Sequence, residues 1–115
     1  MKEPRTRPTD VPVISAQQAD EYASWFRCLS DGTRVRILNY LAAVGEPVTV
    51  GQITEAVGKS QSTVSRHLQI LVDDRFVFAE PDGVRTLVTV NQACMTALPD
   101  AAAAIMAAPD RTSTS

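Results

Sequence analysis

Apolar side chains recur at intervals of three and four residues in the first half of the chain, which is the spacing of one face of an α-helix. The first stripe consists of Tyr22, Trp25, Phe26 and Leu29. It follows "SAQQ", which matches a capping box: the hydroxyl of Ser15 can accept a bond from the helix, and the Gln three residues later can reach back. We therefore expect a first helix that begins after Ser15 and runs through Leu29.

A second helix is predicted in "TRVRILNYLAAV", residues 33–44, because Val35, Leu38 and Leu41 recur on one face. Asp31 precedes this segment and can cap its first backbone N–H groups. The Gly and Pro in the following "GEP" are typical of a helix end. We expect the apolar face of this helix to be buried.

Two short helices with a tight turn between them are predicted next. In "TVGQITEAVG" the residues Ile53, Ala56 and Val57 give the first helix a buried side, and Gly58 supplies the turn. The second helix begins after Ser60, which can act as its N-cap. Its apolar side consists of Val64, Leu68 and Leu71. Two such helices joined by a tight, Gly-containing turn form a helix-turn-helix.

β-branched and aromatic residues follow in "RFVFAEPDGVRTLVTV", interrupted by a Pro-Asp-Gly turn, and this pattern predicts a β-hairpin. The Ala-rich segment 91–108 is expected to be helical, with Pro99 bending it or beginning a second helical piece. The order α-α-α-α-β-β-α is that of a winged helix-turn-helix with an added C-terminal helix. The fold class is therefore mainly α with a small β-hairpin (α+β).

The composition is that of one small globular domain, with 115 residues, 44% of them hydrophobic and 21% charged. Residues 1–14 and 109–115 are rich in Pro, charged or other polar residues, and we expect disordered tails around a single winged-helix domain at 15–108. No apolar run approaches the ~20 residues that span a bilayer, and the N-terminus lacks the apolar stretch of a secretory signal. The protein is expected to be cytoplasmic, without a membrane partner.

The sequence offers little for catalysis. It has one His, no Gly-rich phosphate loop and no nucleophile motif, so no acid–base pair or triad can be assembled from it. We expect no enzymatic activity and no organic cofactor. The formal net charge of −2 gives no overall attraction to nucleic acid, so any contact with phosphate must come from local patches.

The helix predicted after Ser60 carries short polar side chains where surface helices normally carry Lys and Glu. Ser is a mediocre helix former because its hydroxyl competes for backbone hydrogen bonds. A helix that enters the DNA major groove needs side chains that are small or that reach base edges and phosphates. We therefore predict a DNA-contacting surface made of Lys59, Ser60, Gln61, Ser62, Thr63, Ser65, Arg66, His67 and Gln69.

Arg85 is a further candidate, because it follows the hairpin turn and a wing tip can contact the DNA backbone. An equal alternative is a solvated charge beside Glu80 and Asp82. Arg75 is a weaker phosphate candidate. The polar face could also be plain solvent-facing surface, and the same fold could serve a protein–protein contact instead of DNA.

The segments "FRCLSDGTRVRILNYL" and "TVGQITEAVGKSQSTVSRHLQILVDDRFV", with the hairpin end "VTVN", resemble the ArsR/SmtB family of dimeric bacterial metal- and metalloid-responsive regulators. The similarity covers residues 16–106, and its most specific parts are L-x-D-x-T-R-x-R-I-L and Q-S-T-V-S-R-H-L-x-I-L. The resemblance implies a winged-helix homodimer, paired through its first and last helices, that binds a palindromic double-stranded DNA operator. Most such proteins repress transcription and release DNA when an inducer binds.

The effector is predicted from the cysteines together with this resemblance. The family's arsenic-type Cys-Val-Cys box would fall at residues 48–51, where no Cys stands, and the last helix has no His for a zinc-type site. Cys28 closes the first predicted helix and Cys94 opens the last, and the resemblance brings these helices to a shared dimer interface. With Asp100, these thiols could hold Ni(II), Zn(II) or an As(III)-like metalloid as effector.

Three alternatives to this metal site remain open. The two thiols could form a redox switch, or they could pack as small hydrophobic side chains. The protein could also sense nothing alone and work with an accessory protein.

Overall fold

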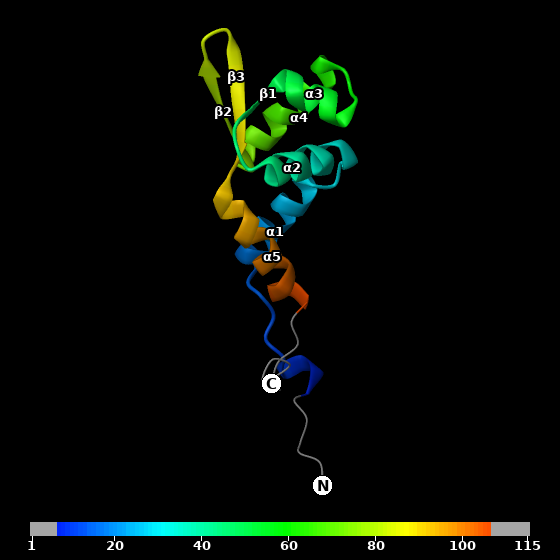
Figure 1. Cartoon of the computed structure of the whole chain (residues 1–115). Helices are drawn as coiled ribbons and strands as arrows, with labels where there is room; N and C mark the ends of the chain where they lie inside the picture. Colours follow the sequence, from blue (N-terminus) through cyan, green and yellow to red (C-terminus); the bar gives the residue numbers. More distant parts are fainter. Residues whose placement is uncertain (1–6, 107–115) are drawn as a thin grey trace.

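The computed structural model describes residues 7–106. The predicted winged helix-turn-helix is confirmed: a helical head carries a β-hairpin, and a further helix follows it (Figure 1). In chain order the elements are a 3₁₀ turn η1 (Pro8–Asp10), α1 (Ala16–Cys28), α2 (Gly32–Val44), β1 (Val48–Thr49), α3 (Val50–Val57), α4 (Gln61–Asp73), β2 (Val77–Asp82), β3 (Arg85–Val90) and α5 (Gln92–Met106).

The domain boundaries stay predictions. The expected tail at 109–115, the first six residues of the tail at 1–14, and the end of the domain at 107–108 lie outside the described residues. None of the helices within 7–106 is long and apolar enough to cross a membrane.

The helix starts follow from polar side chains that cap them, as predicted. Ser15 accepts a bond from the Gln18 backbone, and Asp31 accepts bonds from Thr33 N at 2.8 Å and Arg34 N at 3.2 Å. The expected capping box at α1 is wrong in its second half, because the Gln18 side chain donates to Glu21 instead. A complete box starts α3, where Thr49 and Gln52 bond each other's backbone N–H groups.

The sheet has three strands in the order β1-β3-β2, all antiparallel. The predicted hairpin is present, with Asp82 opposite Arg85 at its tip and Gly83 in the left-handed conformation at φ 68°. The sequence analysis missed β1, which pairs Val48 with Val88. A two-residue strand has no alternation to detect, and only its partner in β3 defines it.

The core lies between α2, α3, α4 and the sheet, and its largest fully buried side chains are Phe76, Ile37, Leu41, Ile53, Leu71, Val64, Val77 and Val88. The predicted inner face of α2 is partly wrong: Leu41 is buried, but Val35 is 45% exposed and Leu38 only half-buried. Ala56, expected to be buried on α3, is also exposed. Because apolar residues stand on two sides of α2, spacing alone could not identify the side that faces the core.

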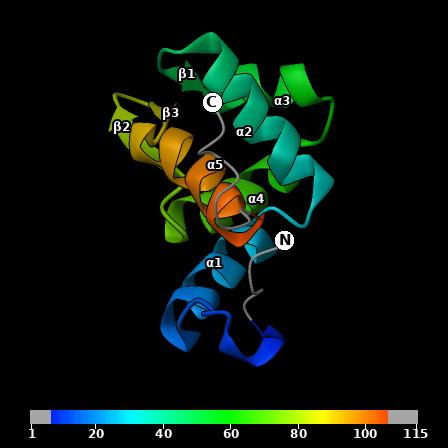
Figure 2. The same cartoon turned by 90° about the horizontal axis from the view of Figure 1, so that it is seen from below.

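Helices α1 and α5 lie together at the end of the molecule away from the hairpin tip, and Figure 2 shows α5 from below in front of the head. α5 is continuous, with Pro99 inside it. Cys28 is the buried residue of α1 and Ala101 that of α5. Every other residue of these two helices is exposed or half-buried, so α1 and α5 leave much of their surface without a partner in the described part of the chain.

Candidate nucleic-acid interface

Helix α4 has the two different sides that its sequence predicted. Val64, Leu68 and Leu71 are buried and fasten the helix to the core. The opposite side, which is exposed, presents Gln61, Ser62, Ser65, Arg66 and Gln69. The helix is thus held by its apolar side while a short-chained polar side faces outward.

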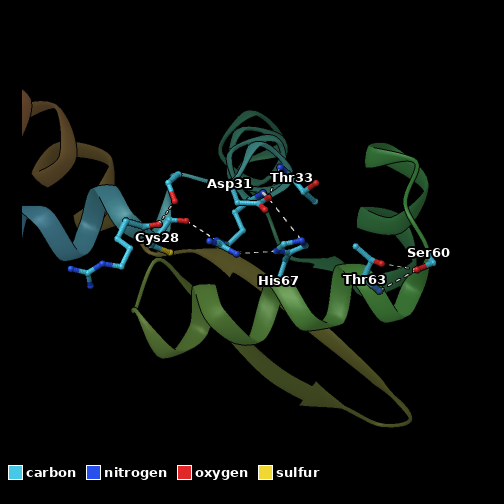
Figure 3. Close-up of polar contacts among 9 residues, drawn as sticks. Cys28, Asp31, Thr33, Ser60, Thr63 and His67 are labelled. Atoms are coloured by element: carbon cyan, nitrogen blue, oxygen red, sulfur yellow. Dashed lines mark hydrogen bonds and ion pairs between the residues drawn. The ribbon is translucent and has the colours of Figure 1, made fainter.

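Ser60 and Thr63 organise the start of this helix, at the end of α4 away from His67 (Figure 3). The Ser60 hydroxyl accepts from the Thr63 backbone N–H at 3.2 Å and donates to the Thr63 hydroxyl at 3.0 Å. Ser62 lies 3.3 Å from the same Ser60 hydroxyl. The predicted N-cap is confirmed, and these hydroxyls lie beside the exposed first turn.

The exposed side chains of α4 differ in how they are held. The Gln69 amide donates to Asp73 at 2.9 Å, so it is tied to its own helix. Gln61, Ser65 and Arg66 make no side-chain hydrogen bond to any other residue within 7–106. Their polar groups are available to an external partner.

His67 does not lie where the sequence analysis put it. It is only 5% exposed and projects from α4 toward the start of α2 (Figure 3). The sequence analysis assigned this polar residue to the polar side with Arg66, but helix geometry turns His67 by about 100° from Arg66 and onto the buried side, next to the buried Leu68. His67 is therefore removed from the predicted DNA-contacting set.

A hydrogen-bond network surrounds the buried imidazole. Arg34 Nη1 donates to His67 Nδ1 at 3.1 Å, and Arg34 Nε donates to the carbonyl oxygen of Cys28 at 2.6 Å. His67 Nε2 lies 3.9 Å from Asp31 Oδ1. The network joins the end of α1, the start of α2 and the middle of α4.

The same surroundings shift two pKa values. Burial lowers the pKa of His67 below its usual 6.5, with the cations Arg66, Arg34 and Lys59 adding to the shift and Asp31 opposing it. Desolvation acts to raise the pKa of Asp31, but the backbone N–H groups of Arg34 and Thr33 outweigh it, and the pKa lies below its ordinary value. The network thus favours a neutral imidazole beside a charged carboxylate.

Two arginines have structural roles that the sequence analysis missed. Arg34 belongs to the network at His67, and Arg36 Nη1 donates to the carbonyl oxygen of Val57 at 2.9 Å, at the end of α3. No local pattern indicates these bonds, because their acceptors lie far away in the sequence. The cations that remain exposed beside α4 are Lys59, Arg66 and Arg75.

The hairpin is a weak source of positive charge. Arg85 donates to Asp82 Oδ2 from Nε at 3.2 Å and from Nη2 at 3.1 Å, and Glu80 is exposed on the same strand as Asp82. Arg85 is thus paired across the turn, in agreement with the alternative of a solvated charge beside acidic neighbours.

Each thiol lies close to the turn that ends α4, Cys28 near Asp74 and Cys94 at the Arg75 carbonyl. Burial, together with the Asp74 side chain, raises the pKa of Cys28 to about 12. Cys94 is half-buried, donates to the carbonyl oxygen of Arg75 at 3.4 Å, and has its pKa raised by burial. Both thiols are therefore protonated at neutral pH, so neither is an activated nucleophile, and a metal ion that binds one of them must displace its proton.

The predicted metal set of Cys28, Cys94 and Asp100 is not assembled in one chain. Within residues 7–106, no group of three His, Cys, Asp or Glu side chains could hold a metal ion. Cys28 contacts the Asp74 side of the turn, whereas Asp100 is exposed on α5. A site with three ligands from a single subunit does not fit these residues.

An apolar groove lies between α2 and α5. Its volume is about 370 Å³. It is lined by Leu29, Val35, Leu38, Asn39, Ala42, Val90, Cys94, Met95, Leu98 and Pro99. Val35 and Leu38, which the sequence analysis placed on the buried face of α2, therefore line this groove, a second apolar surface of the helix.

Comparisons with known proteins agree with this architecture. Residues 31–78 match the family described as bacterial regulatory protein, arsR family. Over 78 residues the chain is 36% identical to a protein of Streptomyces lividans named "Probable mercury resistance operon repressor". That match covers 68% of this chain and 61% of the length of the relative.

Two solved structures extend the similarity over more of the chain. The AntR antimony-specific transcriptional repressor is 27% identical, with a TM-score of 0.68 and coverage of 90% of this chain and 95% of AntR. A homodimeric winged helix-turn-helix DNA-binding domain from Mycobacterium bovis is 29% identical, with a TM-score of 0.61 and coverage of 79% and 88%. These relatives are named as regulators, which agrees with the expectation that the chain is not an enzyme.

Proposed function

The chain belongs to the ArsR family of bacterial regulatory proteins, and from that premise we propose that it is a transcriptional regulator that binds operator DNA through α4. The observation that carries the proposal is the exposed side of α4, where Gln61, Ser65 and Arg66 have no partner within residues 7–106. Their chemistry suits base edges and phosphates.

Each part of this surface has a distinct role in the proposal. Arg66 can bond guanine bidentately or contact a phosphate, and Gln61 can bond adenine. The short side chains of Ser62 and Ser65 let the helix approach the bases closely. The first turn of α4 presents backbone N–H groups beside Lys59, and both features favour a DNA phosphate there.

We further propose that the protein acts as a homodimer through α1, α5 and the groove between α2 and α5. This end of the chain exposes the apolar side chains of Phe26, Val35, Met95, Ile105 and Met106. A second copy would cover them, since soluble monomers rarely leave large contiguous apolar patches in water. The homodimeric relative from Mycobacterium bovis supports this arrangement. Two copies of α4 would then contact the half-sites of a palindromic operator.

Fluorescence anisotropy with the DNA upstream of the chain's own gene tests the proposal, with a scrambled duplex of equal length as control. We expect selective binding whose affinity falls steeply as salt rises, because each neutralised phosphate releases counterions. Equal binding to both duplexes, or affinity that does not respond to salt, would reject the proposal and favour a protein–protein role for the fold.

For the effector we propose a thiophilic metal or metalloid ion that binds at Cys94. The names of two relatives refer to mercury and antimony, and thiolates are the ligands that soft ions prefer. Ni(II) and Zn(II), considered from the sequence, have less support, because the only imidazole is buried in the Arg34 network. Further ligands would have to come from a rearranged Cys28 or from a second copy. The redox switch and the accessory protein stay predictions.

The same anisotropy assay, repeated with As(III), Hg(II), Ni(II) and Zn(II), tests this effector class. Release of operator DNA by a thiophilic ion, lost in Cys94→Ser, is the expected result. Binding that is insensitive to every ion would overturn the metal response and leave the DNA-binding function intact.

A further inference from the structure

His67 is the buried polar side chain of the head, since no other polar or charged residue within 7–106 is buried. It stands on α4, directly after the exposed Arg66. Arg34 connects it to the junction of α1 and α2, residues 28–34, by donating both to the imidazole and to the Cys28 carbonyl. One side chain of α4 is thus linked, through Arg34, to the end of α1 and the start of α2.

We propose that His67 is a positioning residue for DNA binding: its unprotonated Nδ1 accepts from Arg34 and holds α4 against the α1–α2 junction, and protonation of the ring loosens that hold and weakens binding. The proposal rests on the proposed function of α4 as the DNA-contacting helix. It adds a residue that acts from the buried side of α4 and does not contact DNA.

The hydrogen bond from the Arg34 guanidinium defines the tautomer of the His67 ring. A guanidinium has only N–H donors, so His67 Nδ1 must offer its lone pair to Arg34, and the neutral ring carries its proton on Nε2. Nε2–H then faces Asp31 at 3.9 Å. A second proton on Nδ1 would remove the acceptor that Arg34 Nη1 has in His67 and place two cations in contact.

The charged groups around the ring come from each side. Asp31 and Arg34 face it from α2, and Arg66 and Lys59 act on it from α4 and the turn before it. Three cations and one carboxylate therefore surround the ring, and burial and the cations together outweigh the attraction of Asp31. The pKa of His67 is lowered in the folded protein, so the unfolded chain binds the proton first as pH falls. The contribution of the neutral His67 ring to stability is thus fully present above pH 6.5 and is lost as the pH falls from 6.5 to the lowered pKa of the folded state.

The imidazole can be observed without assignment, because His67 is the only His in the chain. Two-bond ¹H–¹⁵N correlation spectra of the ¹⁵N-labelled full chain report the tautomer and the titration midpoint. The Nε2–H tautomer and a midpoint below 6.5 are expected. The Nδ1–H tautomer, or a midpoint at or above 6.5, would overturn the proposal, and this measurement requires neither DNA nor a variant.

Operator affinity at pH 7.5 and at one pH unit below the measured titration midpoint of His67 tests the link to DNA. The wild type should bind about tenfold more weakly at the lower pH, because protonation of the ring leaves the buried Arg34 donor without its acceptor. His67→Asn keeps an acceptor near the Nδ1 position but does not titrate, so its affinity should be nearly independent of pH in this range. His67→Phe keeps the ring volume without the acceptor and should bind weakly at both values.

The outcomes separate this proposal from the one on which it rests. Equal pH dependence in the wild type and His67→Asn would overturn the positioning role while operator binding at pH 7.5 stands. A wild type that binds operator at neither pH would remove the proposed function, and the positioning role with it. Thermal unfolding of each variant at both pH values checks that the affinities refer to folded protein.

Discussion

Arg85 and Asp82 face each other across the tip of the hairpin, with two guanidinium nitrogens 3.1 and 3.2 Å from the same carboxylate oxygen. Both side chains are more than half exposed, so the pair contributes little to stability. Its consequence is electrostatic: the positive charge at the tip is offset, and Glu80 adds a further negative charge. In the proposed complex, α4 supplies most of the attraction to DNA, and the wing supplies little.

Asp82→Asn should therefore strengthen DNA binding. The change removes a negative charge and releases the Arg85 guanidinium for phosphate, and we expect operator affinity to rise about threefold to tenfold at low salt, with a steeper salt dependence. Asp10→Asn is the matched control, because Asp10 pairs with Arg7 at the same sequence spacing in the N-terminal segment. An unchanged affinity and salt slope in Asp82→Asn would show that the wing does not approach the DNA backbone.

Arg66→Ala should weaken operator binding by about 1–3 kcal/mol, because Arg66 is the exposed cation within α4 and has no partner in residues 7–106. The melting temperature and oligomeric state should not change, since Arg66 makes no contact that stabilises the fold. Arg7→Ala removes the same charge far along the chain and serves as control. Equal losses in both variants would mean that only net charge matters.

Local features of the fold could be predicted from the sequence, and features that depend on distant residues could not. Ser60 caps α4 as predicted because its partner, Thr63, is three residues away. His67 was assigned to the wrong side because its partners Asp31 and Arg34 belong to another helix, more than thirty residues earlier. A polar side chain is buried only where such partners exist, and a single sequence does not identify them.

The same limit explains why the buried face of α2 was predicted only in part. Val35 fits the helical spacing of a core residue, yet it lines a groove on the opposite side of α2 from Ile37. Periodicity identifies apolar faces but does not say what covers them. A helix that packs on both the core and a second surface therefore looks the same in sequence as a helix with one wide buried face.

Val35→Glu should disrupt the proposed homodimer. The substitution puts a charge into the apolar groove between α2 and α5, where a second copy would have to desolvate it. Sedimentation velocity at micromolar concentration should show a monomer, with weaker operator binding. Val84→Glu makes the same exchange at the fully exposed hairpin tip and should stay dimeric. If Val35→Glu also remains a dimer, the groove does not belong to the interface.

Asn91→Ala should destabilise the junction between α4, the hairpin and α5. Its amide donates to the carbonyl oxygen of Arg75 at 2.8 Å, and its carbonyl oxygen accepts from Ala93 N at the start of α5. Arg75 has a left-handed φ of 65°, so this bond helps to hold an unfavourable backbone conformation. We expect a loss of about 1–2 kcal/mol in urea unfolding. Gln92→Ala, at the exposed neighbour, should have little effect.

The two thiols should differ sharply in reactivity. Cys28 is buried with a pKa of about 12, whereas Cys94 is half-buried and borders the groove. Alkylation requires both access and the thiolate, so iodoacetamide at pH 8 should modify Cys94 slowly and leave Cys28 unmodified. The Val35→Glu background keeps the groove open and removes protection by a second copy. Mass spectrometry of digested protein locates the label, and Cys94→Ser in that background should abolish it.

Equal labelling of both residues would contradict this prediction. It would mean that the end of the molecule at α1 opens readily in solution, so that the contact of Cys28 with the turn after α4 does not persist.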